Sequence, residues 1–422
     1  MKQLISKLSK NRILRYIVFG FIILSLFLYV FSIPAFSGRR PHYVVSYIFM
    51  GLLATLVVFY TIVFVNIEAS LNPILIIPLF FTIFAFVGTA FYSHDFRMWL
   101  TLILMFVTFI IFYYSFIAIE KEWIIICVIV SGFLCFAIYF LIHYTPTIIN
   151  SLFNKKFPSK LGSDFDNVNT IGFYFAVAFV LSLYETLFHK KLVELVYIAP
   201  AILFFTLGLF TGSRAFIVSA LAGAIAVIFF RLKKRKLIFV AILATLVGLF
   251  FILIRIPALS ELKDRYDRAL FTLFGVGNSK VEESTVQRMV WPQYAFYLGG
   301  KNLLIGYGCD GFKNVSGVAT YSHNNFSEVI CNFGIIGFIF YHLSFFVPLG
   351  ITFKLKARDY LLVPIIVVVY LSRCFFGVIY YAKEAYLIIA LCFYLVRDYK
   401  FSPTKIFKKK TTSPLDYYEV SI

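Results

Sequence analysis

The sequence predicts an all-α polytopic membrane protein with about twelve transmembrane helices and one large extracytoplasmic loop. Of its 422 residues, 61% are hydrophobic and only 14% are charged, which is more apolar surface than a soluble chain of this length can bury. Windows of about 20 apolar residues, long enough to cross the hydrocarbon layer of a bilayer, recur along the whole chain. Transmembrane β-strands would instead give short alternating segments, and the sequence has none.

The apolar windows set the boundaries of the predicted spans. The first follows a basic start and has no small-residue cleavage site after it, so we expect a membrane helix rather than a removed signal. The spans are 14–34, 43–65, 71–93, 98–119, 123–143, 168–188, 191–210, 212–230, 237–254, 325–349, 360–380 and 384–398.

The formal net charge of +19 indicates topology rather than nucleic-acid binding. Basic residues cluster between apolar spans, and such clusters mark cytoplasmic loops and favour anionic lipid surfaces. We therefore expect a cytoplasmic N-terminus. The predicted regions are nine transmembrane helices in 1–254, a large extracytoplasmic loop with short helices in 255–324, three helices in 325–398, and a basic cytoplasmic tail in 399–422.

Two features bear on metal binding, and we interpret neither as a metal site. The six cysteines are dispersed, without a CxxC pair or zinc-ligand spacing, which is typical of apolar packing residues. Asp164 and Asp166 form an Asp-x-Asp pair, a metal-binding signature in some membrane enzymes. Asp166 or Asn167 is also an ordinary N-cap for the following span, and we favour that interpretation.

The first candidate site motif is "LGLFTGSRAFIVSA", 207–220. Thr211 or Ser213 can cap the helix that follows, whose free N–H groups and positive dipole end then lie beside Arg214. A helix N-terminus with an arginine suits an anion such as phosphate. The alternative is an arginine that snorkels to lipid phosphates at a helix end.

The second motif, "STVQRMVWPQYAFYLGGKNLLIGYGCDGF", covers 284–312. Arg288 lies in a short predicted helix, with a solvated loop charge as the alternative interpretation. Aromatic residues such as Tyr294 suit sugar faces or lipid headgroups, or form an interfacial aromatic belt. We interpret Gly306 and Gly308 as a turn, because no strand precedes them as in a phosphate-binding loop.

The third motif, "YSHNNFSEVICNFGIIGFIFY", covers 321–341. Asn325, Glu328 and Asn332 recur at helical spacing and form one polar stripe, which we expect to face the protein interior. His323 lies at the mouth of this span and is expected to titrate near neutral pH as an acid or base. The alternative is a plain His-Asn helix cap. Gly334 is expected to let a neighbouring helix approach closely.

Three further charges lie at or near the ends of the last two spans. Arg373 lies in the outer part of the predicted span 360–380. Lys383 and Glu384 lie at the turn that follows this span. Charged groups at membrane depth pair with one another or serve function. They predict either an ion pair or an addition to a cationic pocket.

Together, "FTGSRAFIVS", "QRMVWPQYAF…NLLIGYGCDGF" and "SHNNFSEVICNFGIIGFIFY" resemble the motifs of the O-antigen ligase and O-antigen polymerase superfamily. The resemblance covers roughly 165–345. It implies a GT-C-like membrane fold and glycan transfer at the outer face from a polyprenyl pyrophosphate donor, with no metal and no cofactor. Asn332 departs from the commoner pattern, where a second acidic residue is often seen, and this gives His323 more weight.

The resemblance also implies roles for the motif residues. Arg214 and Arg288 would stabilise the departing pyrophosphate, because arginines bind phosphate oxygens bidentately. His323 would deprotonate the acceptor hydroxyl or orient the phosphate, and Glu328 is the alternative base. Asn325 and Glu328 would hold the sugar or position His323. The residues expected to bind substrate are Glu328, Asn325, Ser213, Arg373 and Tyr294.

The function we predict is a polymerase of undecaprenyl-pyrophosphate-linked oligosaccharide repeat units, which are both donor and acceptor, into O-antigen, capsular or exopolysaccharide. The alternative is a ligase that transfers the glycan to lipid A-core, and a further alternative is a flippase for lipid-linked oligosaccharides. We expect a multi-pass protein of the bacterial cytoplasmic (inner) membrane with its site facing the periplasm. A chain-length regulator and a flippase are expected partners, and nucleic acid is not.

Overall fold

The protein is described by a computed structural model over 11–35, 40–64, 75–119, 121–139, 168–188, 196–211, 213–232, 267, 283–318, 320–355 and 358–397. Every regular element within these ranges is a helix. Seven of the described helices are long and apolar enough to cross a membrane, and two further apolar helices are shorter. These observations confirm the predicted class, a helical multi-pass membrane protein. The predicted span at 237–254 lies outside the described residues.

Eleven elements coincide with predicted spans, counting one π-helical turn with the helix that it continues. They are α2 (Arg12–Ala35), α3 (Arg40–Phe64), α5 with η2 (Ile76–Gly88 and Thr89–Ser93), α6 (Phe96–Ala118), α7 (Lys121–Tyr139), α9 (Val168–Phe188), α10 (Ile198–Phe210), α11 (Arg214–Leu232), α16 (Asn325–Leu355), α17 (Leu362–Cys374) and α18 (Lys383–Leu395). The other elements are α14 (Glu283–Lys301), α15 (Gly311–Ser316) and the short 3-10 helix η6 (Arg358–Leu361).

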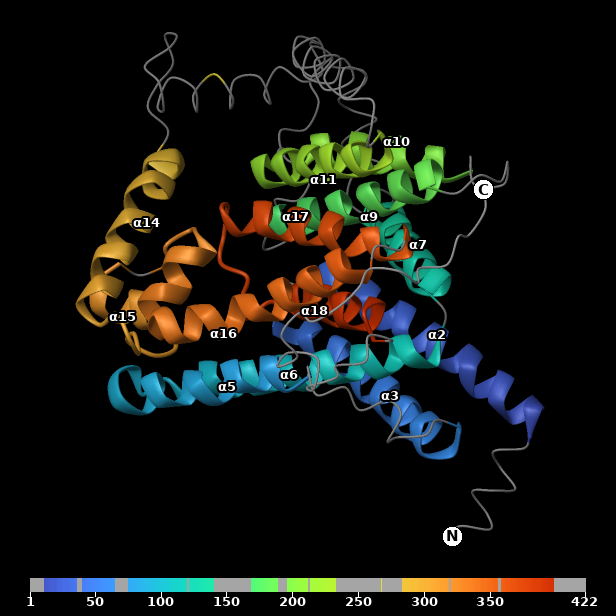
Figure 1. The fold of residues 1–422 in the computed structure, drawn as a ribbon, viewed down its shortest axis with the longest axis horizontal. Helices are drawn as coiled ribbons and strands as arrows, with labels where there is room; N and C mark the ends of the chain where they lie inside the picture. The colour runs from blue at the N-terminus through green and yellow to red at the C-terminus, as the bar shows by residue number, and fades with distance from the viewer. Residues whose placement is uncertain are drawn as a thin grey trace, which may run out of the picture.

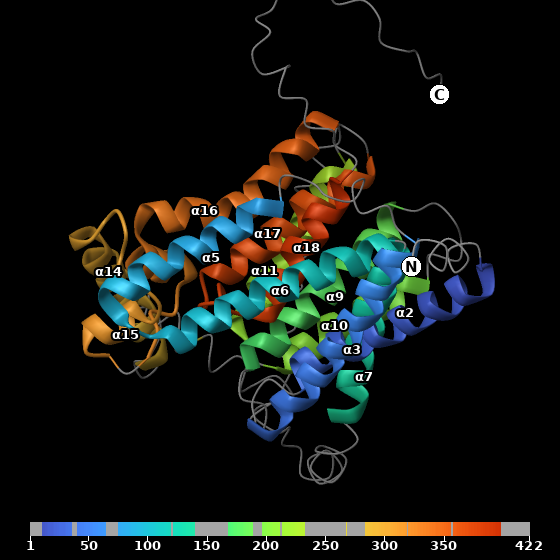
Figure 2. The same ribbon diagram turned by 90° about the horizontal axis from the view of Figure 1, so that it is seen from below.

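The spanning helices lie side by side, and α14 crosses their ends (Figure 1). The same arrangement is visible from below, where α5, α16 and α6 run toward α14 and α15 at one end of the bundle (Figure 2). Helix α14 packs on α16, and α11 packs between α9 and α17. The predicted loop 255–324 therefore includes a helix of 19 residues, longer than the short helices expected there.

Helix α16 is broken at Gly334, whose φ of 61° and ψ of −168° are not helical. The break leaves backbone carbonyls without partners in the helix, and a membrane interior does not tolerate that. The loop before α15 supplies the partners: Tyr307 N–H donates to Cys331 O at 3.0 Å and Gly308 N–H donates to Asn332 O at 2.6 Å. Gly334 is thus needed for close approach of this loop, whereas the sequence predicted a neighbouring helix.

The loop at Gly306 and Gly308 is a tight turn, as predicted, because both glycines adopt positive φ. A Cβ on Gly306 would lie 2.5 Å from the Asn332 carbonyl, and one on Gly308 would lie 2.6 Å from the Gly88 oxygen. These glycines therefore let the loop fit between α5 and the broken α16.

The predicted span 360–380 is wrong at its C-terminal end, because α17 stops at Cys374. A turn follows, and it is held by Asn325, whose Oδ1 accepts N–H groups from Ile379 and Tyr380 at 2.9 and 3.0 Å. Gly377 lies against the Arg373 guanidinium, where a Cβ would be 2.5 Å from Nη1. The sequence window continued the helix because this turn is as apolar as the spans around it.

The described cysteines match their predicted role as packing residues. The five cysteines whose side chains are described are buried, and they form no disulfide with one another: Cys127, Cys309, Cys331, Cys374 and Cys392.

Candidate functional site

The first part of the site is the start of α11. Ser213 caps this helix, because its Oγ accepts the Phe216 N–H at 3.3 Å, and it also donates to Asn169 Oδ1 at 3.0 Å. Both hydroxyl functions of Ser213 therefore serve the local fold, and the side chain is buried. Arg214 is the first residue of the helix and remains partly exposed.

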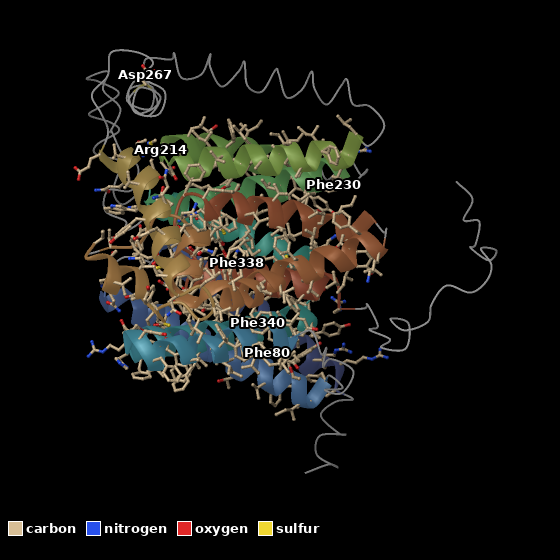
Figure 3. The ribbon with its side chains drawn as sticks, turned by 60° about the vertical axis from the view of Figure 1, so that its left-hand side comes forward. Phe80, Arg214, Phe230, Asp267, Phe338 and Phe340 are labelled. Carbon is tan, nitrogen blue, oxygen red and sulfur yellow. The ribbon has the colours of Figure 1, made fainter. Side chains whose placement is uncertain are left out.

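Helix α14 lies next to Arg214 and is joined to it by a hydrogen bond. Arg214 Nη1 donates to Thr285 Oγ1 over 2.7 Å, and Figure 3 shows Arg214 where α11 meets α14. Arg288 follows Thr285 by one helical turn, so the two residues lie on the same face of α14. This hydrogen bond therefore places Arg214 beside the helix that carries Arg288.

Trp291 continues this face by another turn and contacts the third predicted residue. Its indole is stacked nearly parallel on the His323 imidazole, with ring centroids 5.3 Å apart and an interplanar angle of 8°. The Tyr321 ring also packs against the imidazole, with ring centroids 4.6 Å apart and an interplanar angle of 69°. Arg214, Arg288, Trp291 and His323 are all partly exposed, and we call these four residues the rim.

The electrostatic environment of His323 differs from the prediction of titration near neutral pH. Burial and the positive charge of Arg288 lower the pKa of His323 to about 4. The imidazole is therefore neutral at neutral pH and can accept a proton or a hydrogen bond. The pKa shift also indicates that Arg288 lies within electrostatic range of the ring.

The turn that carries His323 is strained and closely supported. His323 has a φ of 61°, a left-handed conformation that is costly for a residue with a side chain. Asn324, not His323, caps α16, since its Oδ1 accepts N–H groups from Phe326 and Ser327 at 2.9 and 3.1 Å. Glu328 Oε2 accepts the Ser322 N–H at 2.7 Å, directly beside His323.

The predicted polar stripe on α16 faces inward, as expected, and its groups bond the protein itself. Glu328 is 2% exposed, and Asn325 and Asn332 are fully buried. Asn332 Oδ1 accepts the Phe312 N–H at 2.8 Å, and its Nδ2 donates to Tyr380 Oη at 3.1 Å. Because these residues and Ser213 hold backbone segments in place, we call Ser213, Asn325, Glu328 and Asn332 the buried frame.

Two other predicted residues, Arg373 and Tyr294, do not belong to the rim. Arg373 is 2% exposed and interacts electrostatically with Glu384 and Tyr321, while its Nε and Nη1 have no hydrogen-bond partner among the described residues. Tyr294 is partly exposed and packs against Tyr297 and Phe312 with centroid distances of 6.3 and 6.2 Å.

Sequence reasoning missed the contacts of Thr285 and Trp291. A signal was present, because Thr285, Arg288 and Trp291 recur every three residues and so share one helical face. The described residues hold no group of three metal-ligating side chains, and the Asp164-x-Asp166 pair lies outside them.

The fold and site define a multi-pass helical membrane protein with two arginines and a histidine at one end of the bundle. Residues 199–342 match the family model described as O-Antigen ligase. This segment contains every rim residue, and the match confirms the predicted resemblance to the O-antigen ligase and polymerase superfamily. No curated protein matches the chain.

Proposed function

We propose that this protein is a glycosyltransferase that polymerises lipid-linked oligosaccharide repeat units at the outer face of the cytoplasmic membrane. The donor is a glycan on undecaprenyl pyrophosphate, and the acceptor is a newly delivered unit on the same carrier. The hydrogen bond of 2.7 Å between Arg214 and Thr285 carries the proposal, because it joins Arg214 to α14, the helix that carries Arg288 and contacts His323 through Trp291. The match to the O-Antigen ligase family supports a glycan-transfer chemistry.

The reaction follows from the charges of the rim. The acceptor hydroxyl oxygen attacks the anomeric carbon of the donor, and His323 takes the hydroxyl proton. The bond between that carbon and the pyrophosphate oxygen breaks, and the pyrophosphate leaves with the electron pair. Arg214 and Arg288 stabilise the negative charge that develops on it. The N-terminus of α11 adds a positive dipole end beside Arg214.

The buried frame supports this chemistry without touching substrate. We propose that Glu328 holds the turn of His323 through the Ser322 N–H, so that it positions the base instead of replacing it. Asn325 and Ser213 likewise hold the backbone. Tyr294 remains our candidate for a sugar contact. Arg373 adds positive charge beneath the turn, near Tyr321.

A ligase that transfers the finished glycan to lipid A-core is the second candidate, because the family match over residues 199–342 is compatible with both activities. Gene deletion distinguishes the two. Loss of a polymerase leaves single repeat units on the surface anchor, whereas loss of a ligase leaves long glycans on the carrier lipid. In the same cells, His323→Ala should reproduce the deletion phenotype at normal protein level. Long surface glycans in a strain that expresses only His323→Ala would refute the assigned base.

A further inference from the structure

Within the described part of the chain, no side chain or carbonyl forms a hydrogen bond that would fix the His323 ring. A catalytic histidine usually has its second ring nitrogen bonded to a carboxylate or carbonyl group, which sets both the tautomer and the orientation of the ring. Here Nδ1 of His323 is buried and has no hydrogen-bond partner among the described residues. The ring as a whole is partly exposed, so Nε2 is the nitrogen that a ligand can reach.

Aromatic packing takes the place of that hydrogen bond. Trp291 stacks on one face of the imidazole, with centroids 5.3 Å apart and planes 8° from parallel. The Tyr321 ring packs at 69° to the imidazole with centroids 4.6 Å apart, and the two contacts together restrict rotation of the ring. Trp291 is itself fixed, because α14 packs on α16 through Ala295, Leu298 and Cys331. A neutral imidazole stacks favourably on indole, and offset stacked pairs contribute beyond the area they bury.

We propose that Trp291 is a positioning residue that fixes the plane of the His323 imidazole, so that Nε2 points to the acceptor hydroxyl. This inference rests on the proposed function for its catalytic part, whereas the stack itself can be measured without substrate. With this role for Trp291, one face of α14 contributes three residues to the proposed site. Thr285 contacts Arg214, Arg288 supplies charge, and Trp291 orients the base from the next turn of the same face.

The stack can be tested by fluorescence, since the chain has three tryptophans, Trp99, Trp123 and Trp291. In the W99F/W123F protein, Trp291 is the sole tryptophan and can be excited selectively over the tyrosines, and a protonated imidazole stacked on indole quenches its emission. We expect emission to fall with a midpoint at about pH 4, the pKa of His323, and this transition to disappear on adding His323→Ala. A transition that persists without His323 would overturn the stacking arrangement.

The catalytic part is tested with three single variants in purified, full-length protein supplied with lipid-linked repeat units. Trp291→Ala should lower kcat by about 10- to 100-fold with little change in KM, because the ring loses its orientation. Trp291→Phe keeps an aromatic face and should recover most of kcat. Phe296→Ala, on an exposed part of the same helix, should remain within about twofold of the parent, as expected of surface substitutions.

Each outcome separates this inference from the proposed function. If His323→Ala is inactive but Trp291→Ala keeps full kcat, the positioning role is wrong and the proposed base stands. A rise in KM with unchanged kcat in Trp291→Ala would also overturn positioning, since it indicates a sugar contact. If His323→Ala retains activity, the proposed function fails while the fluorescence result still reports the stack. If Trp291→Ala does not fold, the kcat of Trp291→Leu tests the positioning role instead. The fluorescence titration of the W99F/W123F protein, which keeps Trp291, still tests the stack.

Discussion

The rim and the buried frame lie close together in the chain's motifs, but their side chains differ in exposure and in what they bond. Rim side chains are partly exposed, and the charge of Arg288 adds to burial in lowering the pKa of His323. Frame side chains are buried, and their oxygen atoms accept backbone N–H groups from loops and helix ends. Burial together with backbone bonding therefore distinguishes the residues that hold the site from those proposed to act in it. Substitutions in the rim should reduce turnover, and substitutions in the frame should reduce stability.

The largest effect is expected for the rim residue Arg288. Arg288→Ala should lower glycan transfer by about 10²- to 10³-fold, since it removes one preorganised donor to the leaving pyrophosphate. Arg288→Lys should recover only part of this loss, because a lysine cannot bind phosphate bidentately. The measurement is the rate of glycan elongation in purified protein. Lys313→Ala serves as the control, as its side chain is 52% exposed at the same end of the bundle.

The frame residue Asn325 should show the opposite pattern. Asn325→Ala leaves the buried N–H groups of Ile379 and Tyr380 without an acceptor, at a cost of about 2 to 4 kcal/mol. We expect a lower thermal unfolding midpoint in detergent and less folded protein, with near-normal turnover per folded molecule. Asn314→Ala, an exposed position on α15, is the matched control. A fully stable but inactive Asn325→Ala protein would place Asn325 with the rim.

Glu328 tests the boundary between the two groups. Glu328→Gln keeps the shape and an oxygen that can accept the Ser322 N–H, so activity should fall by only a few-fold if Glu328 supports the turn. A loss comparable to that of His323→Ala would identify Glu328 as the base. The comparison is made on kcat for the two variants under identical conditions.

The smallest expected effect is the dependence of kcat/KM and kcat on pH. His323 must be neutral to accept a proton, so kcat/KM, which reports the free protein, should stay level at neutral pH and fall through about pH 4. Bound pyrophosphate offsets the charge of Arg288, so the acid limb of kcat should lie at higher pH, toward the ordinary His pKa. An acid limb of kcat at the same pH as that of kcat/KM would contradict this coupling.

The lowered pKa of His323 also makes the free energy of unfolding depend on pH. The pKa of His323 in the folded protein lies below the value of 6.5 expected when unfolded, so the unfolded chain binds more protons between these values. The stabilisation is present above about pH 6.5 and is lost as pH falls toward 4. Thermal unfolding of His323→Ala should lack this contribution.

Much of the fold could be predicted from the sequence, because the signal for a membrane helix is local. Apolar windows identified the described spanning helices, and polar spacing predicted the inward stripe of Asn325, Glu328 and Asn332. The sequence alone could not predict which partner each of these polar side chains bonds. Whether Asn325 accepts backbone N–H groups depends on a turn 54 residues later in the chain. The stack of Trp291 on His323 likewise depends on how α14 packs against α16.

The break of α16 at Gly334 has a consequence for biosynthesis. If α16 entered the bilayer with the Cys331 and Asn332 carbonyls unpaired, each carbonyl would destabilise the inserted helix by about several kcal/mol. Their partners, Tyr307 and Gly308, precede the break in the chain and therefore leave the ribosome before it. We expect α16 to insert stably only together with that preceding loop, so that translation order itself protects the nascent site from a misfolded intermediate.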